Sequence, residues 1–237
     1  MPIDQLMQDL ETAGRAAHAH TGAWVAGILR ARIADGQLLP GSKLSEQALA
    51  EALSVSRNTL REAFTVLAGE SVVTRIPNRG VFVASPGPEE IREIYRVRRM
   101  IEPAVALWAP ELDVDALEAI VASARASREV GDVPAMAGAN QRFHEALIAA
   151  SGSEHLQALM RQVLAQMRLV FHAMSDAPDF HSRYVDLNAR LADELREGDR
   201  ERAAETLRGY LDTAEAELLG HFGAAASPEN RSARGWS

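Results

Sequence analysis

Cysteine does not occur anywhere in the 237 residues, which excludes disulfide bonds and thiolate metal ligands. Long apolar runs are also missing, since none approaches the roughly 18 residues that a membrane-spanning helix needs. The first residues, MPIDQLMQDLETAGR, lack the basic start and the apolar segment of a signal peptide. The sequence therefore predicts a soluble protein that works in the cytoplasm, with no membrane partner.

Positive charge is scarce overall, with a net charge of −8, but it is unevenly distributed. Residues 21–85 carry seven Lys and Arg against five Asp and Glu, whereas residues 86–237 carry 17 against 25. Apolar residues make up 47% of the chain, which is ample for a core, and the length allows one large domain or two of ordinary size. The charge pattern favours two domains, of which only the first suits a nucleic acid.

The stretch SVSRNTLREAF, residues 54–64, has the pattern of a short turn followed by a recognition helix. Ser56 is a suitable N-cap, because its side-chain oxygen can accept a hydrogen bond from a free first-turn amide. Apolar residues recur after it at spacings of three and four: Leu60, Ala63, Phe64 and Leu67. Arg57 and Arg61 lie on another face, which a recognition helix would present to bases and phosphates. For these arginines alone, a solvated helix face is the alternative interpretation.

Two further helices and a hairpin flank this stretch. The run WVAGILRARIA predicts a helix over residues 24–34 with one apolar side: Trp24, Ile28, Ala31 and Ile33. Ser45 caps a second helix, EQALAEAL. After Gly69 two short strands follow, residues 72–76 and 81–83, and the turn between them ends at Gly80, which supplies a positive φ. Three helices and a hairpin predict a winged helix-turn-helix domain in residues 21–85.

The segment Ser85-Pro86-Gly87-Pro88 predicts a domain boundary, and the pattern beyond it is helical throughout. The predicted helices are residues 89–108, 114–130, 133–151, 154–174, 182–197 and 200–222. Residues 86–222 are thus expected to form an all-α bundle of six to seven helices. Residues 1–20 are expected to form an arm or a short helix, and residues 223–237 a flexible tail. The predicted fold class is mainly α, with a small β-hairpin wing in the first domain.

Three separated stretches of the first domain occur in the order and at the spacing of a known family: LRARIADGQLLPG, LSEQALAEALSVSRNTLREAF and RGVFV. They resemble the DNA-binding domain of the GntR family of bacterial transcription regulators. The resemblance implies that double-stranded DNA is contacted by six residues of the recognition helix and the wing: Arg57, Asn58, Thr59, Arg61, Arg79 and Gly80. Ser54 departs from the family pattern, which usually has glycine there, and Asn58-Thr59 stands where Thr-Pro is common.

Three stretches of the helical half, YRVRRMIEP, NQRFHEAL and LADELREGDRERAAETLRGYL, are similar to the FCD effector-binding domain of the FadR subfamily. In most FCD domains one aspartate and three histidines hold a divalent metal, so the resemblance implies a metal site at the matching positions. The matching positions here are Asn140, His144, Asn188 and Tyr210, so one ligand of four is retained. Neutral amides and a phenol are poor ligands for such a cation. We therefore predict that this protein has no metal and no other cofactor.

The same four residues remain candidates for binding an effector. Asn140 and His144 share one helix face, and the apolar pattern around Asn188 and Tyr210 turns both residues inward. Inward polar groups need partners, so two interpretations stay open: a metal-free effector pocket, or a structural cluster whose members satisfy one another. Arg98 is a fifth candidate, either as an anchor for an effector carboxylate or as a plain ion pair with the residue four positions later.

The resemblance implies a ligand-responsive transcription regulator. We expect a repressor that binds a two-fold operator as a homodimer and is released by a small organic acid. One alternative is a DNA-binding regulator with a purely structural polar core and no effector. A weaker alternative is an all-α enzyme using Asn140, His144 and Tyr210, but no aligned nucleophile or paired carboxylate accompanies them.

Overall fold

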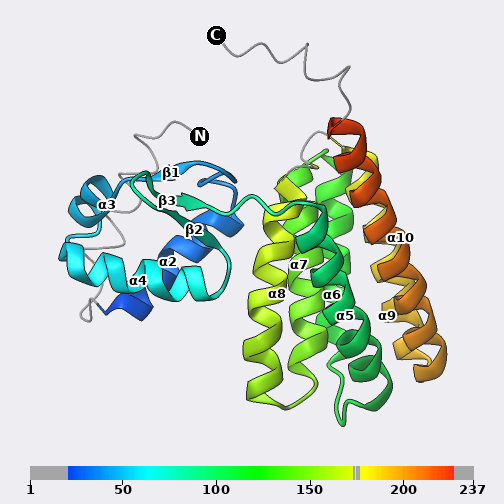
Figure 1. The fold of residues 1–237 in the computed structure, drawn as a ribbon. Helices are drawn as coiled ribbons and strands as arrows, with labels where there is room; N and C mark the ends of the chain where they lie inside the picture. The colour runs from blue at the N-terminus through cyan, green and yellow to red at the C-terminus, as the bar shows by residue number, and fades with distance from the viewer. Residues whose placement is uncertain (1–20, 173, 175–176, 227–237) are drawn as a thin grey trace. The chain divides into compact units, whose positions relative to one another are not determined.

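The computed structural model describes residues 21–172, 174 and 177–226, and it divides the chain into two compact units between Ser85 and Pro86 (Figure 1). The fold class predicted from the sequence is confirmed, since a three-helix winged unit is followed by an all-helical one. The predicted N-terminal arm, residues 1–20, and most of the predicted tail lie outside the described residues. No helix in the described part of the chain is long and apolar enough to cross a membrane.

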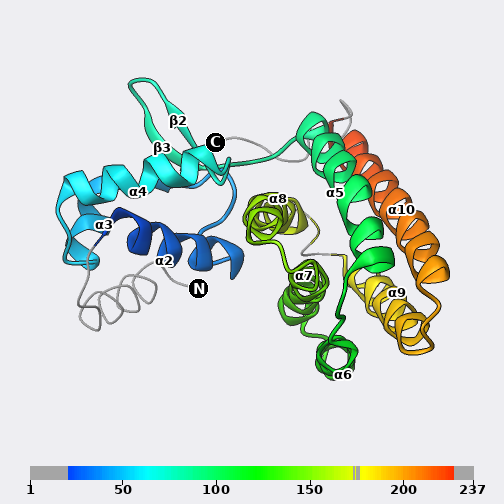
Figure 2. The same ribbon diagram turned by 90° about the horizontal axis from the view of Figure 1, so that it is seen from below.

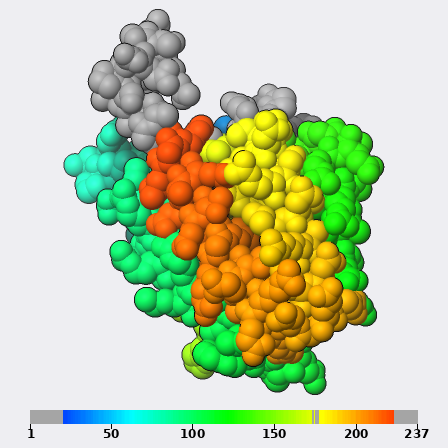
Figure 3. Space-filling model, turned by 90° about the vertical axis from the view of Figure 1, so that its right-hand side faces the viewer, coloured from blue at the N-terminus to red at the C-terminus, as the bar shows by residue number. Residues whose placement is uncertain are grey.

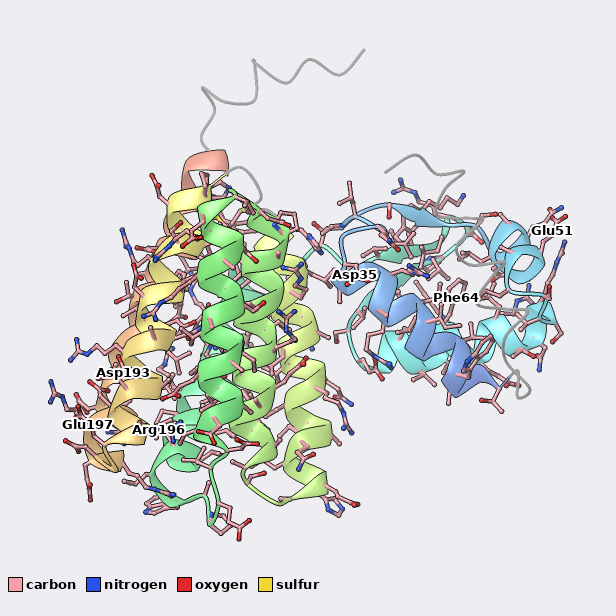
Figure 4. All side chains as sticks on the ribbon, turned by 180° about the vertical axis from the view of Figure 1, so that it is seen from behind. Asp35, Glu51, Phe64, Asp193, Arg196 and Glu197 are labelled. Atoms are coloured by element: carbon pink, nitrogen blue, oxygen red, sulfur yellow. The ribbon has the colours of Figure 1, made fainter. Side chains whose placement is uncertain are left out.

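Three helices of the first unit lie within the described residues: α2 (Gly22–Ala34), α3 (Glu46–Ala52) and α4 (Arg57–Gly69). Each begins at a hydroxyl N-cap, and in α4 the Ser56 side chain accepts a hydrogen bond from the Thr59 amide at 3.0 Å. The buried side of α4 consists of the four residues that the spacing predicts: Leu60, Ala63, Phe64 and Leu67. Phe64 is fully buried in the core of this unit (Figure 4).

The apolar side predicted for α2 is wrong in most of its residues. The buried residues are Gly22, Val25, Ala26, Leu29 and Ile33, of which only Ile33 belongs to the predicted set. Nearly every side of this helix carries apolar residues, so the sequence pattern defines no single stripe. Packing against α4 decides which side is covered.

A three-stranded antiparallel sheet completes the first unit, in the order β1 (Lys43–Leu44), β3 (Gly80–Val83), β2 (Val73–Ile76). β2 and β3 form the predicted hairpin, with Thr74 opposite Phe82. Their turn requires left-handed backbone at Asn78 (φ 60°) and at Gly80 (φ 110°), which explains the glycine. β1 was not predicted, because two residues are too few to show the alternation of a strand.

Six helices of the second unit lie within the described residues: α5 (Pro88–Trp108), α6 (Val114–Glu129), α7 (Val133–Ala149), α8 (Glu154–His172), α9 (Pro178–Arg196) and α10 (Arg200–Ala226). α5 packs against α10, α6 packs against α7, and α9 contacts α6, α7 and α10 (Figure 2). Arg196 near the end of α9 pairs with Asp115 and Glu118 of α6 (Figure 4).

The largest differences from the expected helix boundaries are at the start of α9 and the end of α10, while the other ends agree within one or two residues. α9 begins at Pro178 rather than at Ser182, because a proline fits the first turn of a helix, where its missing N–H is not needed. α10 continues to Ala226, so residues 223–226, expected in the tail, are helical. Gly223 is a possible stop signal, but the three alanines after it favour a helix, which continues to Ala226.

Candidate functional site

A groove of about 520 Å³ lies between α4 and the β2–β3 hairpin. Three of the six residues predicted to contact DNA line it: Asn58, Arg61 and Gly80. Arg75 of β2 lies on the same wall, so two guanidinium groups face one concave surface. The groove therefore joins the recognition helix and the wing in one concave surface, where Glu46 and Glu62 balance the charges of the two arginines.

Arg61 is held in place from two sides. Its Nε donates to Oε2 of Glu46 at 3.0 Å, while its side chain stays 62% exposed. Arg75 donates through Nη2 to the backbone carbonyl of Arg61 at 2.9 Å and to the Thr65 hydroxyl at 2.7 Å. These bonds join the wing to the middle of the recognition helix, which fixes the width of the groove.

The other three predicted residues lie outside the lining of the groove. Arg57 is exposed at the first position of α4, and the Thr59 hydroxyl lies 2.9 Å from that of Ser56, within the helix cap. Arg79 is exposed in the hairpin turn, with its guanidinium 5.8 Å from the centre of the Phe82 ring. These residues flank the groove at the helix start and at the wing tip.

Sequence reasoning missed Glu46, Thr65 and Arg75 as parts of this surface. Glu46 looks like an ordinary first-turn acid of α3, and Thr65 like an exposed helix position. Only Arg75 carried a signal, as a basic residue on the outward side of a strand next to the wing turn.

The four positions matching the family's metal ligands meet inside the helical unit, although they come from three helices. Asn188 of α9 donates to Oδ1 of Asn140 on α7 at 2.8 Å, and the Tyr210 hydroxyl of α10 donates to the same oxygen at 2.7 Å. Nε2 of His144 lies 2.9 Å from the Tyr210 oxygen. All four residues are at most 5% exposed, so this core cluster is shielded from water.

α5 extends the core cluster with a buried ion pair. Arg98 donates to both carboxylate oxygens of Glu102, at 2.6 and 3.3 Å, and both side chains are at most 1% exposed. Oε2 of Glu102 also lies 2.9 Å from Nδ1 of His144. The predicted ion pair of Arg98 therefore forms, and Glu102, which was not a predicted site residue, connects it to His144.

Burial and charge set the protonation of the core cluster. Burial alone would raise the pKa of Glu102, but Arg98 and then His144 outweigh it and lower that pKa to about 2. Burial lowers the pKa of His144, although Glu102 opposes the shift. Burial also raises the pKa of the Tyr210 phenol well above its usual value. At neutral pH the cluster thus contains an ionised Arg98–Glu102 pair, a neutral imidazole and a neutral phenol.

These residues do not fit the divalent metal of most FCD domains. Tyr210 stays protonated, so it offers no phenolate, and the Glu102 carboxylate is already shared by Arg98 and His144. Across residues 21–172, 174 and 177–226, no three His, Asp or Glu side chains are grouped so that they could hold a metal ion. The absence of a metal from this protein remains our prediction.

Besides Nδ1 of His144, which faces Glu102, two polar atoms of the core cluster are buried without a hydrogen-bond partner: Nδ2 of Asn140 and Oδ1 of Asn188. One is a donor and the other an acceptor. Turning both amides over exchanges oxygen for nitrogen, but it still leaves one donor and one acceptor unused. Buried groups of this kind are normally paired, so each amide retains one unused hydrogen-bonding group.

The first unit is a winged helix whose recognition helix and wing frame a groove with exposed arginines, and the second is a helical unit with a polar interior. This combination defines the class of winged-helix transcription regulators. Residues 21–83 match the gntR family of bacterial regulatory proteins, and residues 93–213 match the FCD domain. The chain belongs to the GntR family and carries the FCD domain of its FadR-type members. It is therefore a DNA-binding transcription regulator and not an enzyme.

Named relatives agree with this family. The gluconate operon transcriptional repressor of Bacillus subtilis is 32% identical over 60% of this chain and 59% of its own length. The galactonate operon transcriptional repressor of Escherichia coli is 29% identical over 59% of this chain and 71% of its own length. A solved GntR regulator from Rhodococcus sp. RHA1 is 40% identical, with a TM-score of 0.79 over 84% of this chain and 97% of that one.

Proposed function

We propose that this protein is a repressor that binds a two-fold operator as a homodimer and leaves it when a small hydroxylated organic acid binds in the FCD domain. The observation that carries the DNA-binding part is the groove between α4 and the wing, with the exposed Arg57, Arg61 and Arg79 in it and beside it. Arg57, Asn58, Thr59 and Arg61 on α4, with Arg79 and Gly80 on the wing, are proposed to contact the operator.

The proposed dimer follows from the size of the DNA-binding surface. One recognition helix and one wing contact only a few base pairs, which gives little specificity in a genome. Two copies related by a two-fold axis double the contacted site, and a symmetric dimer is the commonest assembly of soluble proteins. Sedimentation of the free protein and of its operator complex measures this directly, and a single copy on the operator would contradict it.

The proposed effector site is the core cluster, namely Asn140, His144, Asn188 and Tyr210 with Arg98. The unused donor and acceptor on Asn140 and Asn188 suit a hydroxyl group, which both accepts and donates. Arg98 is a permanent cation that suits a carboxylate. The relatives named for gluconate and galactonate operons point to the same chemistry, because both compounds are polyhydroxy acids.

Repression and release are tested with an operator selected from random DNA by the protein itself. Gluconate, galactonate and shorter hydroxy acids are then titrated into the complex while fluorescence anisotropy follows the bound DNA. We expect at least one acid to release the wild-type protein from the operator. The same acid should not release the Asn188→Ala variant. Leu159→Ala, at an exposed apolar position of α8, is the matched control.

A purely structural polar core is the competing hypothesis, since its members already bond one another. It predicts that no acid changes operator affinity or the melting temperature. It also predicts that Asn188→Ala changes stability alone.

A further inference from the structure

A second groove, distinct from the core cluster, runs along the outer side of α9 and α10, the face that Figure 3 shows. Its volume is about 480 Å³, within the roughly 300–1,000 Å³ typical of sites for small molecules. Arg183 and Arg190 line it from α9, and Arg202 lines it from α10. These three side chains are between 56% and 59% exposed. We refer to this surface as the α9–α10 groove.

Two of the three arginines share a single carboxylate. Nε of Arg190 lies 2.9 Å from Oε1 of Glu194, and Nε of Arg202 lies 3.3 Å from the same oxygen. The Thr206 hydroxyl donates to this oxygen as well, at 3.0 Å. Arg183 is instead neutralised by Glu217. Glu205 also lines the groove but pairs with Arg208, so the Arg190–Arg202 pair contacts one carboxylate for its two positive charges.

The orientation of this pair is suited to an anion. Both guanidinium groups face Glu194 through Nε, and within the described part of the chain no side chain pairs with their terminal Nη groups. A guanidinium whose Nη groups are available binds a carboxylate or a phosphate by parallel hydrogen bonds. Leu187 adds apolar surface to the lining, which suits a short carbon skeleton.

Tyr210 connects the α9–α10 groove with the core cluster. It lines the groove, yet its hydroxyl donates to Asn140 and lies 2.9 Å from Nε2 of His144. Gly209 beside it has no side chain, and a Cβ added there would meet no atom within 4 Å, so the approach is open. A molecule bound in the groove would thus touch a residue whose other end belongs to the proposed effector site.

We propose that the α9–α10 groove is an anion-binding site that holds the carboxylate or phosphate of a small organic acid between Arg190 and Arg202, and that Tyr210 transmits its occupancy to the core cluster. Binding in the groove does not depend on the proposed function; only the transmission to the core rests on it.

Inorganic phosphate and citrate are the probes, titrated calorimetrically into the full-length protein at constant ionic strength. We expect saturable binding that weakens about tenfold or more in Arg190→Gln/Arg202→Gln, because two charge-assisted contacts are lost. Arg96→Gln is the matched control, an exposed arginine paired with Glu93 of its own helix, and it should bind like wild type. Glu194→Gln should bind the anions more tightly, since both arginines then lack a counter-charge.

Histidine-labelled NMR tests the transmission in the same samples. Phosphate should shift the His144 ring signals in wild type but not in the double variant, and Tyr210→Phe should keep the binding while reducing the shift. Equal phosphate affinity in the wild type and the double variant would overturn the site. The site would also be overturned if the double variant changed its oligomeric state but kept the phosphate affinity of the wild type. Anion binding without a His144 shift would overturn the transmission alone. Release of DNA by a hydroxy acid with no groove binding would leave the proposed function intact and refute the groove.

Discussion

The first unit presents its functional polar residues to solvent, whereas the second unit buries them. Arg57, Arg61 and Arg79 are exposed and need only the right helix face or turn to be available to DNA. Asn140, His144 and Tyr210 are at most 5% exposed and bond one another. An exposed site is therefore defined by local structure, and a buried site by the partners that three or four helices bring together. The same difference predicts that mutations will affect DNA binding in the first unit and folding in the second.

Removing Arg98 should have the largest effect on stability. Arg98→Met leaves the Glu102 carboxylate buried without its strongest partner, which costs about 3–5 kcal/mol of unfolding free energy. Urea denaturation followed by circular dichroism measures the loss. Arg96→Met, with an exposed pair in the same helix, should change the unfolding free energy by less than about 1 kcal/mol. Equal effects of the two substitutions would refute the contrast between buried and exposed charge.

Removing Arg61 should act on DNA affinity without affecting the fold. Arg61→Ala loses one contact of the proposed interface, worth about 1–3 kcal/mol, or roughly tenfold to a hundredfold in affinity. The unfolding free energy should change by less than about 0.5 kcal/mol, because the lost pair with Glu46 is exposed. Anisotropy titrations at fixed salt test this, with Arg128→Ala of the helical unit as control. Unchanged affinity would remove Arg61 from the interface.

Acid should weaken the helical unit through His144. Its pKa is lowered in the folded state, so the unfolded chain binds more protons below pH 6.5, and stability falls as the pH drops through that value. One group contributes at most about 1.4 kcal/mol per pH unit. His144→Gln should reduce the slope of unfolding free energy against pH between 7 and 5.

His181 contributes with the same sign, since burial lowers its pKa to about 4, so His181→Gln is the comparison variant. Glu102, with a pKa of about 2, contributes stability above pH 4.5 that is lost as the pH falls toward 2. If His144→Gln leaves the slope of unfolding free energy against pH unchanged between pH 7 and 5, the claim that the folded protein holds a neutral His144 is contradicted.

The smallest effect is expected at Ser54, in the turn before the recognition helix. Ser54 adopts φ 55°, a left-handed conformation that costs a residue with a side chain about 1–2 kcal/mol, which accounts for the usual glycine of the family. Ser54→Gly relieves this strain but gives the unfolded chain more conformational freedom. The free energy of unfolding should therefore rise by about 0.5 kcal/mol. Thermal unfolding measures the change. A loss of stability would show that the Ser54 side chain contributes more than its strain costs.

Much of the fold could be predicted because its signals are local. The Ser56 cap, the apolar spacing of α4 and the turn ending at Gly80 are each confirmed by hydrogen bonds, burial or φ values. β1 and the buried side of α2 were missed, because a two-residue strand and a helix with apolar residues on nearly all sides carry no period. Glu46 and Arg75 were missed in the groove because their partners lie 15 and 14 residues from them in sequence.

The sequence by itself determined the fold class and the exposed residues of α4 and the wing, because these depend on spacing within a few residues. It also indicated the family, through separated motifs that occur in the family's order. The sequence also placed Asn140, His144, Asn188 and Tyr210 at the positions that hold the metal ligands in most FCD domains. Only the tertiary structure decided that these four bond one another and reach Arg98 through Glu102. Hydrogen bonding depends on distances of about 3 Å between atoms of different helices, and no periodicity in the chain encodes those distances.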